Sequence, residues 1–242
     1  MHTRQTGSPA RRATSWLAAV IGAAIVLLST SLNVRSTMTV DLVLVLALDV
    51  SASVDRREFD LQKDGLAEAF RHPSVLDAIT RGQNKRIAVT VVQWSGYRDQ
   101  TVSVPWQVVA DANSAEKFAQ SLSGMLRRHP DGFTHIAGAI EYSMRLVRSA
   151  PFTAGRMVID VSGDGSNNVH PPPQALRDAA VRAGITVNGL AIVNEAVGLD
   201  DYFRKNVIGG PGAFVIRAHS FDDYAEAIRL KLLREISFKF IL

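Results

Sequence analysis

The strongest constraint on the fold is an apolar run that ends abruptly in a group of oxygen-bearing side chains. The run spans residues 41–48, and Asp49, Ser51 and Ser53 follow it directly. Its length is typical of a buried strand, so one carboxylate and two hydroxyls are expected at the C-terminal tip of that strand. In an open α/β sheet, ligands bind at this edge. A set of ligands made only of oxygen atoms suits a hard divalent cation such as Mg²⁺.

The remainder of the chain alternates strand-length apolar segments with amphipathic helical segments. Further strands are expected at residues 86–94, 100–104, 156–161, 185–193 and 213–217. Helices are expected to begin at Asp55, Ser114, the residues after Thr134, Pro171–Pro173, Asp200 and the residues after Ser220. This order predicts an α/β fold, a doubly wound and mainly parallel six-stranded sheet with helices on both faces. The hairpin-sized loop before residue 100 makes 100–104 the one antiparallel edge strand.

The N-terminal segment, residues 1–38, has the pattern of an export signal. Arg11 and Arg12 precede an apolar run from Trp16 to Leu28. That run is short for a membrane-spanning helix, which needs about 20 residues, and it fits a signal peptide. An uncleaved anchor that associates with a membrane through residues 16–32 remains the alternative. We therefore expect one domain over residues 39–242 and an exported protein, either periplasmic or extracellular.

Charge and cysteine content exclude several functional classes. The net charge is +4, and the four arginines of residues 1–38 account for all of the excess, because no acidic residue occurs there. The expected folded part is thus neutral, without the basic character of a nucleic-acid-binding domain. The chain contains no cysteine, which excludes disulfides, thiolate metal sites and a cysteine nucleophile.

Three loops are expected to meet at the same edge of the sheet. The first carries Asp49, Ser51 and Ser53, the second carries Thr134 at the entry to a helix, and the third carries Asp164 directly after a strand. Two carboxylates and three hydroxyls can hold one Mg²⁺, Mn²⁺ or Ca²⁺ ion, partly through water. Such a site leaves a coordination position for an acidic group of a partner.

The order and spacing of these motifs resemble the metal-ion-dependent adhesion site of von Willebrand factor A domains. The resemblance covers residues 39–236 and implies a von Willebrand A, Rossmann-like fold in which Asp49, Ser51, Ser53, Thr134 and Asp164 bind the metal directly or through water. The chain is more closely similar to a bacterial family of exported A-domain-like proteins of unknown function. That similarity is carried by residues 92–96, 104–106, 159–168, 208–214 and 227–235. One departure is Gly163, which precedes Asp164 where many A domains have threonine.

Several of these residues also have a purely structural interpretation. Asp, Ser and Thr are preferred helix N-caps, so the Asp-x-Ser-x-Ser segment and Thr134 can each serve as a cap. We interpret Asn167 and Asn168 as turn residues. Asp160 is expected to make a structural hydrogen bond inside its strand.

Histidine, tryptophan and lysine side chains outside the motifs have simpler expected roles. His135 and His170 are expected on the surface. Trp94 and Trp106 are expected to pack near the sheet edge, with the alternative that the segment from Trp94 to Gly96 lines a groove for a partner. Lys231 is expected on the surface, far from the site.

These features predict an exported, divalent-cation-dependent protein-binding module whose partner, an unidentified protein, contacts the metal through an exposed Glu or Asp. No nucleophile–base pair is visible, so we do not expect an enzyme. A metal-dependent phosphohydrolase that uses Asp49 or a metal-bound water remains an alternative. The segment lacks the second aspartate of Asp-x-Asp phosphohydrolases. A structural scaffold with a vestigial metal site is the third alternative.

Overall fold

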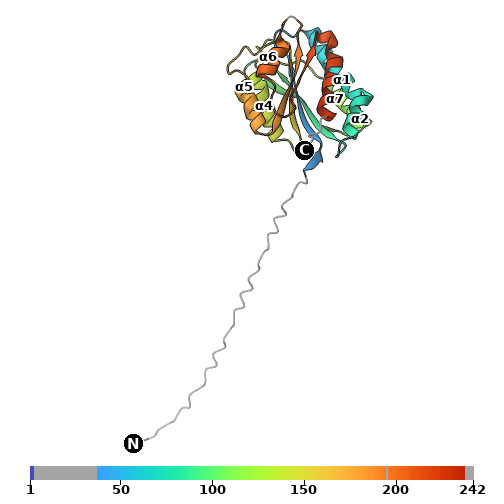
Figure 1. Ribbon diagram of the computed structural model, residues 1–242. Coiled ribbons are helices and arrows are strands. Elements are labelled where there is room, and N and C mark those ends of the chain that lie inside the picture. The colour runs from blue at the N-terminus through green and yellow to red at the C-terminus, as the bar shows by residue number, and fades with distance from the viewer. Residues whose placement is uncertain (3–36, 195, 238–242) are drawn as a thin grey trace. The chain divides into compact units, whose positions relative to one another are not determined.

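The computed structural model of the chain describes residues 1–2, 37–194 and 196–237 (Figure 1). Its contacts divide the chain into residues Met1–Ser36 and a compact unit, Thr37–Leu242. All of the described helices and strands belong to the compact unit. Most of the expected signal or anchor segment therefore lies outside the described residues. Among the described residues, no helix combines the length and the apolar character needed to span a bilayer.

A six-stranded sheet forms the centre of the compact unit. Its strands are β2 (Leu42–Asp49), β3 (Ile87–Trp94), β4 (Gln100–Val109), β6 (Met157–Gly163), β7 (Ile185–Ile192) and β8 (Val215–Ala218), in the spatial order β4-β3-β2-β6-β7-β8. Only β4 runs antiparallel to its neighbour, and it lies at an edge. This arrangement confirms the predicted α/β fold with one antiparallel edge strand.

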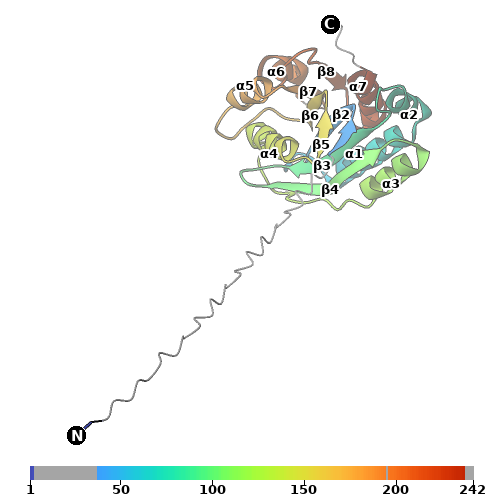
Figure 2. The ribbon, with the colours of Figure 1, turned by 90° about the horizontal axis from the view of Figure 1, so that it is seen from below.

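Helices cover both faces of this sheet (Figure 2). One face packs against α1 (Arg56–Arg71), α2 (Pro73–Thr80), α3 (Ala112–Ser123) and α7 (Tyr224–Ser237), which follows a short 3-10 turn at Phe221–Asp223. The other face packs against α4 (Ile136–Arg148), α5 (Gln174–Arg182) and α6 (Leu199–Asn206). The doubly wound arrangement follows from right-handed crossovers between parallel strands.

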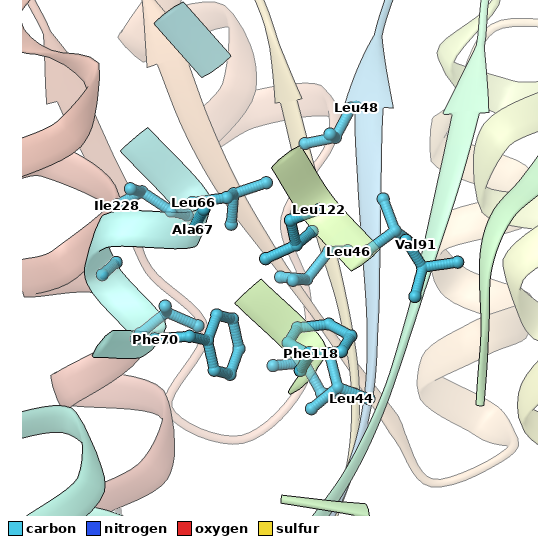
Figure 3. Close-up of a cluster of buried hydrophobic side chains, with 14 of the residues drawn as sticks. Leu44, Leu46, Leu48, Leu66, Ala67, Phe70, Val91, Phe118, Leu122 and Ile228 are labelled. Atoms are coloured by element: carbon cyan, nitrogen blue, oxygen red, sulfur yellow. The ribbon is translucent and has the colours of Figure 1, made fainter. Parts of the chain in front are cut away.

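The central strand β2 supplies both hydrophobic cores. Alternate side chains of a strand point to opposite faces, so an unbroken apolar run fits a strand that is buried on both sides. Residues on the first face are Leu42, Leu44, Leu46 and Leu48, and those on the second are Val43, Val45 and Ala47. Figure 3 shows the first face, where Phe70 of α1 and Phe118 of α3 pack edge to face with ring centroids 4.6 Å apart.

Helix boundaries follow the capping signals in the sequence. The Asp55 carboxylate accepts a hydrogen bond from the Glu58 N–H at 2.8 Å, and the Glu58 side chain accepts one from the Asp55 N–H at 2.8 Å. This capping box fixes the start of α1, as expected. Pro73 then begins α2 at a position where the missing N–H needs no partner.

Two differences from the sequence prediction go beyond small shifts at element ends, such as the start of α3 at Ala112 in place of Ser114. Strand β4 continues to Val109, beyond the expected end at Val104, and passes through Pro105. An edge strand tolerates proline because one side of its backbone has no neighbouring strand. The second difference is a small parallel sheet formed by β1 (Met38–Val40) and β5 (Phe152–Ala154). Strands of three residues are too short to give a periodic signal, so this sheet could not be predicted from the sequence.

Lys231 lies in the protein interior, so the prediction of a surface position is wrong. Its side chain is fully buried, and its Nζ lies 2.6 Å from both Asp160 Oδ1 and Glu235 Oε1. Lys231 follows the buried Tyr224 by seven residues, two helical turns, which places both on the inner face of α7. Asp160 has a structural role, as expected, but its partner is an ammonium group.

The buried charge cluster of Asp160, Lys231 and Glu235 has two carboxyl groups for one ammonium. Asn188 adds a neutral partner, because its Nδ2 donates to Glu235 Oε1 at 3.0 Å. Burial and the nearby Glu235 raise the pKa of Asp160 to about 7, while Lys231 acts in the opposite direction. The raised pKa means that Asp160 keeps its proton more readily than an exposed carboxyl group, which limits the charge that the interior has to hold.

Candidate metal centre

Sheet order brings the first and third predicted loops together. Strands β2 and β6 are neighbours and run parallel, with Leu48 opposite Ser162. Asp49, at the end of β2, therefore lies beside Gly163, and Asp164 follows immediately. The carboxyl ends of adjacent parallel strands form one edge of the sheet, as expected for a ligand site in this class of fold.

Hydrogen bonds connect all three loops. Ser53 Oγ donates to Asp164 Oδ1 at 2.8 Å, and the Ser51 and Ser53 hydroxyl oxygens lie 3.3 Å apart. Thr134 Oγ1, from the loop before α4, lies 3.4 Å from Ser51 Oγ and donates to it. The structure thus brings all five predicted residues into one cluster of oxygen atoms.

Asp49 forms the buried floor of this cluster. Its Oδ1 accepts a hydrogen bond from the Ser51 N–H at 2.8 Å, whereas its Oδ2 is buried without a hydrogen-bond partner. Two effects raise the pKa of Asp49 to about 7: burial is the larger, and the negative charge of Asp164 is the smaller. Burial also raises the pKa of Asp164. A buried carboxylate oxygen without a partner is costly, and a bound cation would satisfy it. The residues present therefore fit a divalent metal.

Gly163 makes room for the Asp49 carboxylate. A Cβ atom at position 163 would lie 2.8 Å from Asp49 Oδ2 and 3.3 Å from Asp49 Cβ. Any side chain here would crowd the oxygen that lacks a partner, because real Cβ contacts are longer. The departure from the A-domain pattern at this position thus has a local physical reason, namely the close approach of two neighbouring strands.

The mouth of the cluster faces solvent. Asp49, Ser51 and Thr134 are buried, whereas Ser53 is exposed and Asp164 is half-buried. The described residues contain no convergent group of three or more His, Asp or Glu side chains, so the centre depends on two carboxylates and three hydroxyls. Hydroxyl and water oxygens are normal ligands of Mg²⁺, which retains several of its waters in proteins.

Asn168 and Arg127 hold the loops in position. Asn168 Oδ1 accepts a hydrogen bond from the Thr134 N–H at 2.9 Å, and the Asn168 N–H donates to the Thr134 carbonyl at 3.0 Å. The Arg127 guanidinium donates to the Ser51 carbonyl at 3.1 Å. Asn168 has a structural role, in keeping with its interpretation as a turn residue. Arg127 has no motif around it, so the sequence carries no signal for its role.

The two histidines near the motifs differ from each other. His170 is exposed, as expected, but His135 is buried, so the surface prediction is wrong for His135. Burial lowers the pKa of His135, and its ring lies 5.8 Å from the ring of Tyr97. His135 is the residue before α4 and follows Thr134 in the same loop, and the conformation of this loop buries the His135 side chain.

Trp94 is fully buried. It therefore packs in the core, as expected, and does not line a groove. Trp106, which is partly buried, lies with its ring centroid 5.9 Å from that of Phe152.

A comparison with protein families identifies a match over nearly the whole compact unit. The family described as "Protein of unknown function (DUF1194)" matches residues 39–240. The chain belongs to this family. No protein with a curated description matches the sequence.

Solved structures with the same fold include a von Willebrand factor type A protein. A von Willebrand factor type A protein from Catenulispora acidiphila has a TM-score of 0.60 and 18% identity over 81% of this chain and 43% of that chain. Proximal thread matrix protein 1 from the mussel byssus, with a zinc-occupied MIDAS motif, has a TM-score of 0.56 and 17% identity. The match covers 83% of this chain and 48% of that chain. The pilus adhesin SpaC from Lactobacillus rhamnosus GG has a TM-score of 0.59 and 14% identity. The match covers 82% of this chain and 30% of that chain.

These similarities confirm the von Willebrand A fold that the sequence motifs implied. The DUF1194 chain spans less than half the length of each of these three proteins. At identities of 14–18% the likeness concerns the fold alone.

Proposed function

We propose that this DUF1194 protein is an exported, divalent-cation-dependent protein-binding module. Asp49, Ser51, Ser53, Thr134 and Asp164 hold one Mg²⁺, Mn²⁺ or Ca²⁺ ion, directly or through water. The observation that carries the proposal is the buried Asp49 Oδ2, which has no partner and faces the space kept free by Gly163. The zinc-occupied MIDAS motif of the mussel byssus protein supports a divalent ion in this fold.

The partner contacts the metal through a carboxylate. Mg²⁺ takes six ligands, so five side chains, some of them acting through water, leave an outward position at the open mouth. A partner Glu or Asp is the hard ligand suited to that position.

A test of this function begins with the metal alone. We expect isothermal titration of purified protein with MgCl₂ and MnCl₂ to show one site, and the melting temperature to rise with free metal concentration. Thr134→Val, which removes one hydroxyl and keeps the shape, should weaken both responses, and Thr134→Ser should restore them. No response at millimolar metal would favour a scaffold with a vestigial site. A phosphoester hydrolysed only with metal would favour the phosphohydrolase alternative.

The proposal also places the protein outside the cytoplasm. Residues 1–38 would direct export or anchor the domain, and the presence of a pilus adhesin among proteins of this fold supports an extracytoplasmic role. We expect alkaline phosphatase fused after residue 40 to be active in a bacterial host, because this enzyme needs an oxidising compartment. An inactive, cytosolic fusion would contradict export. The mass of the mature N-terminus would separate cleavage from anchoring.

A further inference from the structure

Large exposed hydrophobic side chains gather at the edge of the sheet that carries the candidate metal centre. Within residues 1–2, 37–194 and 196–237, the exposed large hydrophobics are Met1, Met38, Tyr97, Leu126, Phe133, Val197 and Leu230. Tyr97, Leu126, Phe133 and Val197 lie in loops on the C-terminal side of β3, α3 and β7, and Phe133 directly precedes Thr134. Single exposed apolar residues are common, but a group beside a polar site indicates an interaction surface.

Phe133 and Tyr97, the Tyr97–Phe133 pair, are exposed aromatic residues on two loops that pack directly on each other. A Cβ at Gly96 would lie 3.3 Å from the Phe133 nitrogen, and one at Gly132 would lie 2.7 Å from the Gly96 nitrogen. Phe133 is 69% exposed and Tyr97 is 63% exposed. Neither belongs to the two hydrophobic cores, so their apolar surface does not serve folding.

The loops that carry this pair are held rigidly. The Ala52 N–H donates to the Gly132 carbonyl at 2.9 Å, and the His135 N–H donates to the Ser95 carbonyl at 3.0 Å. The Tyr97 ring lies 5.8 Å from the His135 ring, and the Arg98 guanidinium lies 5.4 Å from the Tyr97 ring. A rigid aromatic surface loses little conformational entropy on binding, which is the property of interface residues that dominate affinity.

We propose that the partner is a protein segment in which a bulky apolar side chain lies within two residues of the metal-binding Glu or Asp. The carboxylate meets the cation beside Thr134, and the apolar side chain packs on the Tyr97–Phe133 pair. This inference rests on the proposed function and specifies its partner. Phe133 is adjacent to Thr134 in the chain, and an extended segment advances only about 3.3 Å per residue, so neighbouring positions of the partner can reach both. The Arg98 charge adds complementarity to an acidic segment.

The test is a selection of random peptides displayed on phage, with purified protein immobilised in MgCl₂ and bound phage eluted by EDTA. We expect the eluted peptides to share an Asp or Glu with a Phe, Tyr, Trp, Leu, Ile or Met within two positions. A synthetic peptide of that sequence should bind Phe133→Ala and Tyr97→Ala about 5- to 30-fold more weakly than the unchanged protein. Phe133→Leu should retain most of the affinity. Leu230→Ala, a truncation of an exposed residue on α7, is the matched control and should change nothing.

Metal titration of the same variants separates the two proposals. Phe133→Ala should bind Mg²⁺ as the unchanged protein does, because its side chain is not a ligand. Acidic peptides without an apolar neighbour, or equal affinities for Phe133→Ala and Leu230→Ala, would overturn the apolar contact and leave the metal function standing. No enrichment over a Thr134→Val column would count against metal-dependent binding itself. Peptides that EDTA does not release would instead overturn the metal function. A metal-dependent dimer that Phe133→Ala abolishes would show that the occupant is a second copy.

Discussion

Replacing Lys231 with methionine is expected to lower the free energy of unfolding by about 3–5 kcal/mol, the range found when one partner of a buried ion pair is removed. Methionine keeps the length and apolar stem of lysine. It leaves Asp160 and Glu235 without the ammonium that lies 2.6 Å from each of them. Urea denaturation, followed by circular dichroism, measures the change. Lys117→Met on the exposed side of α3 is the control and should stay within about 0.5 kcal/mol.

The loss in Lys231→Met should grow as the pH rises. Lys231 lowers the pKa of Asp160, so its removal raises that pKa further above the value in the unfolded chain. A carboxyl group whose pKa is raised by folding contributes stability at low pH, and that contribution is lost as the pH rises through the folded-state value. The deficit should therefore be smaller at pH 5 than at pH 8.

A triple variant distinguishes the charge effect from lost packing. Lys231→Met combined with Asp160→Asn and Glu235→Gln removes every charge of the cluster and keeps the side-chain shapes. We expect it to recover most of the lost stability, because neutral replacements of a buried charge network are often tolerated. A triple variant that is no more stable than Lys231→Met would show that packing of the lysine stem, and not charge, holds α7 in place.

The second large effect is expected at Asp49. Asp49→Asn should abolish the metal-dependent rise in melting temperature and weaken Mg²⁺ binding more than about 100-fold, since even residues that merely support a ligand contribute 10- to 100-fold. In chelator at pH 8 the same substitution should raise the free energy of unfolding by about 1–3 kcal/mol. The reason is that Asp49 is a buried carboxylate near Asp164 whose pKa is raised to about 7.

The size of the stability gain in Asp49→Asn is expected to depend on pH. At pH 5 the buried group of the unchanged protein holds its proton, so the stability gain of Asp49→Asn should shrink. Gly163→Ala provides a matched comparison, because it keeps both carboxylates and places a Cβ 2.8 Å from Asp49 Oδ2. It should weaken metal binding without the gain in stability. If Asp49→Asn is less stable than the unchanged protein in chelator, the charge of Asp49 has a partner in the folded state, and the metal-site assignment loses its main support.

Local signals in the sequence predicted most of the elements. The capping box of Asp55 and Glu58 marks the start of α1, and strand-length apolar runs located the six strands of the sheet. These signals depend on neighbours within a few residues, so they can be read from the chain alone. Strand β4 is longer than expected. Proline usually ends a strand, so the sequence pattern predicts an end before Pro105, but an edge strand tolerates this residue.

The sequence by itself determined which oxygen-bearing residues end the strands, because Asp49, Ser51 and Asp164 stand directly after apolar runs. Only the tertiary structure decided that β2 and β6 are neighbours, so that these residues share one site with Thr134. It also decided that Lys231 is buried beside Asp160, which lies on a strand 71 residues earlier in the chain. The physical reason is that burial and charge pairing depend on segments distant in sequence, and no local periodicity records which of those segments will meet.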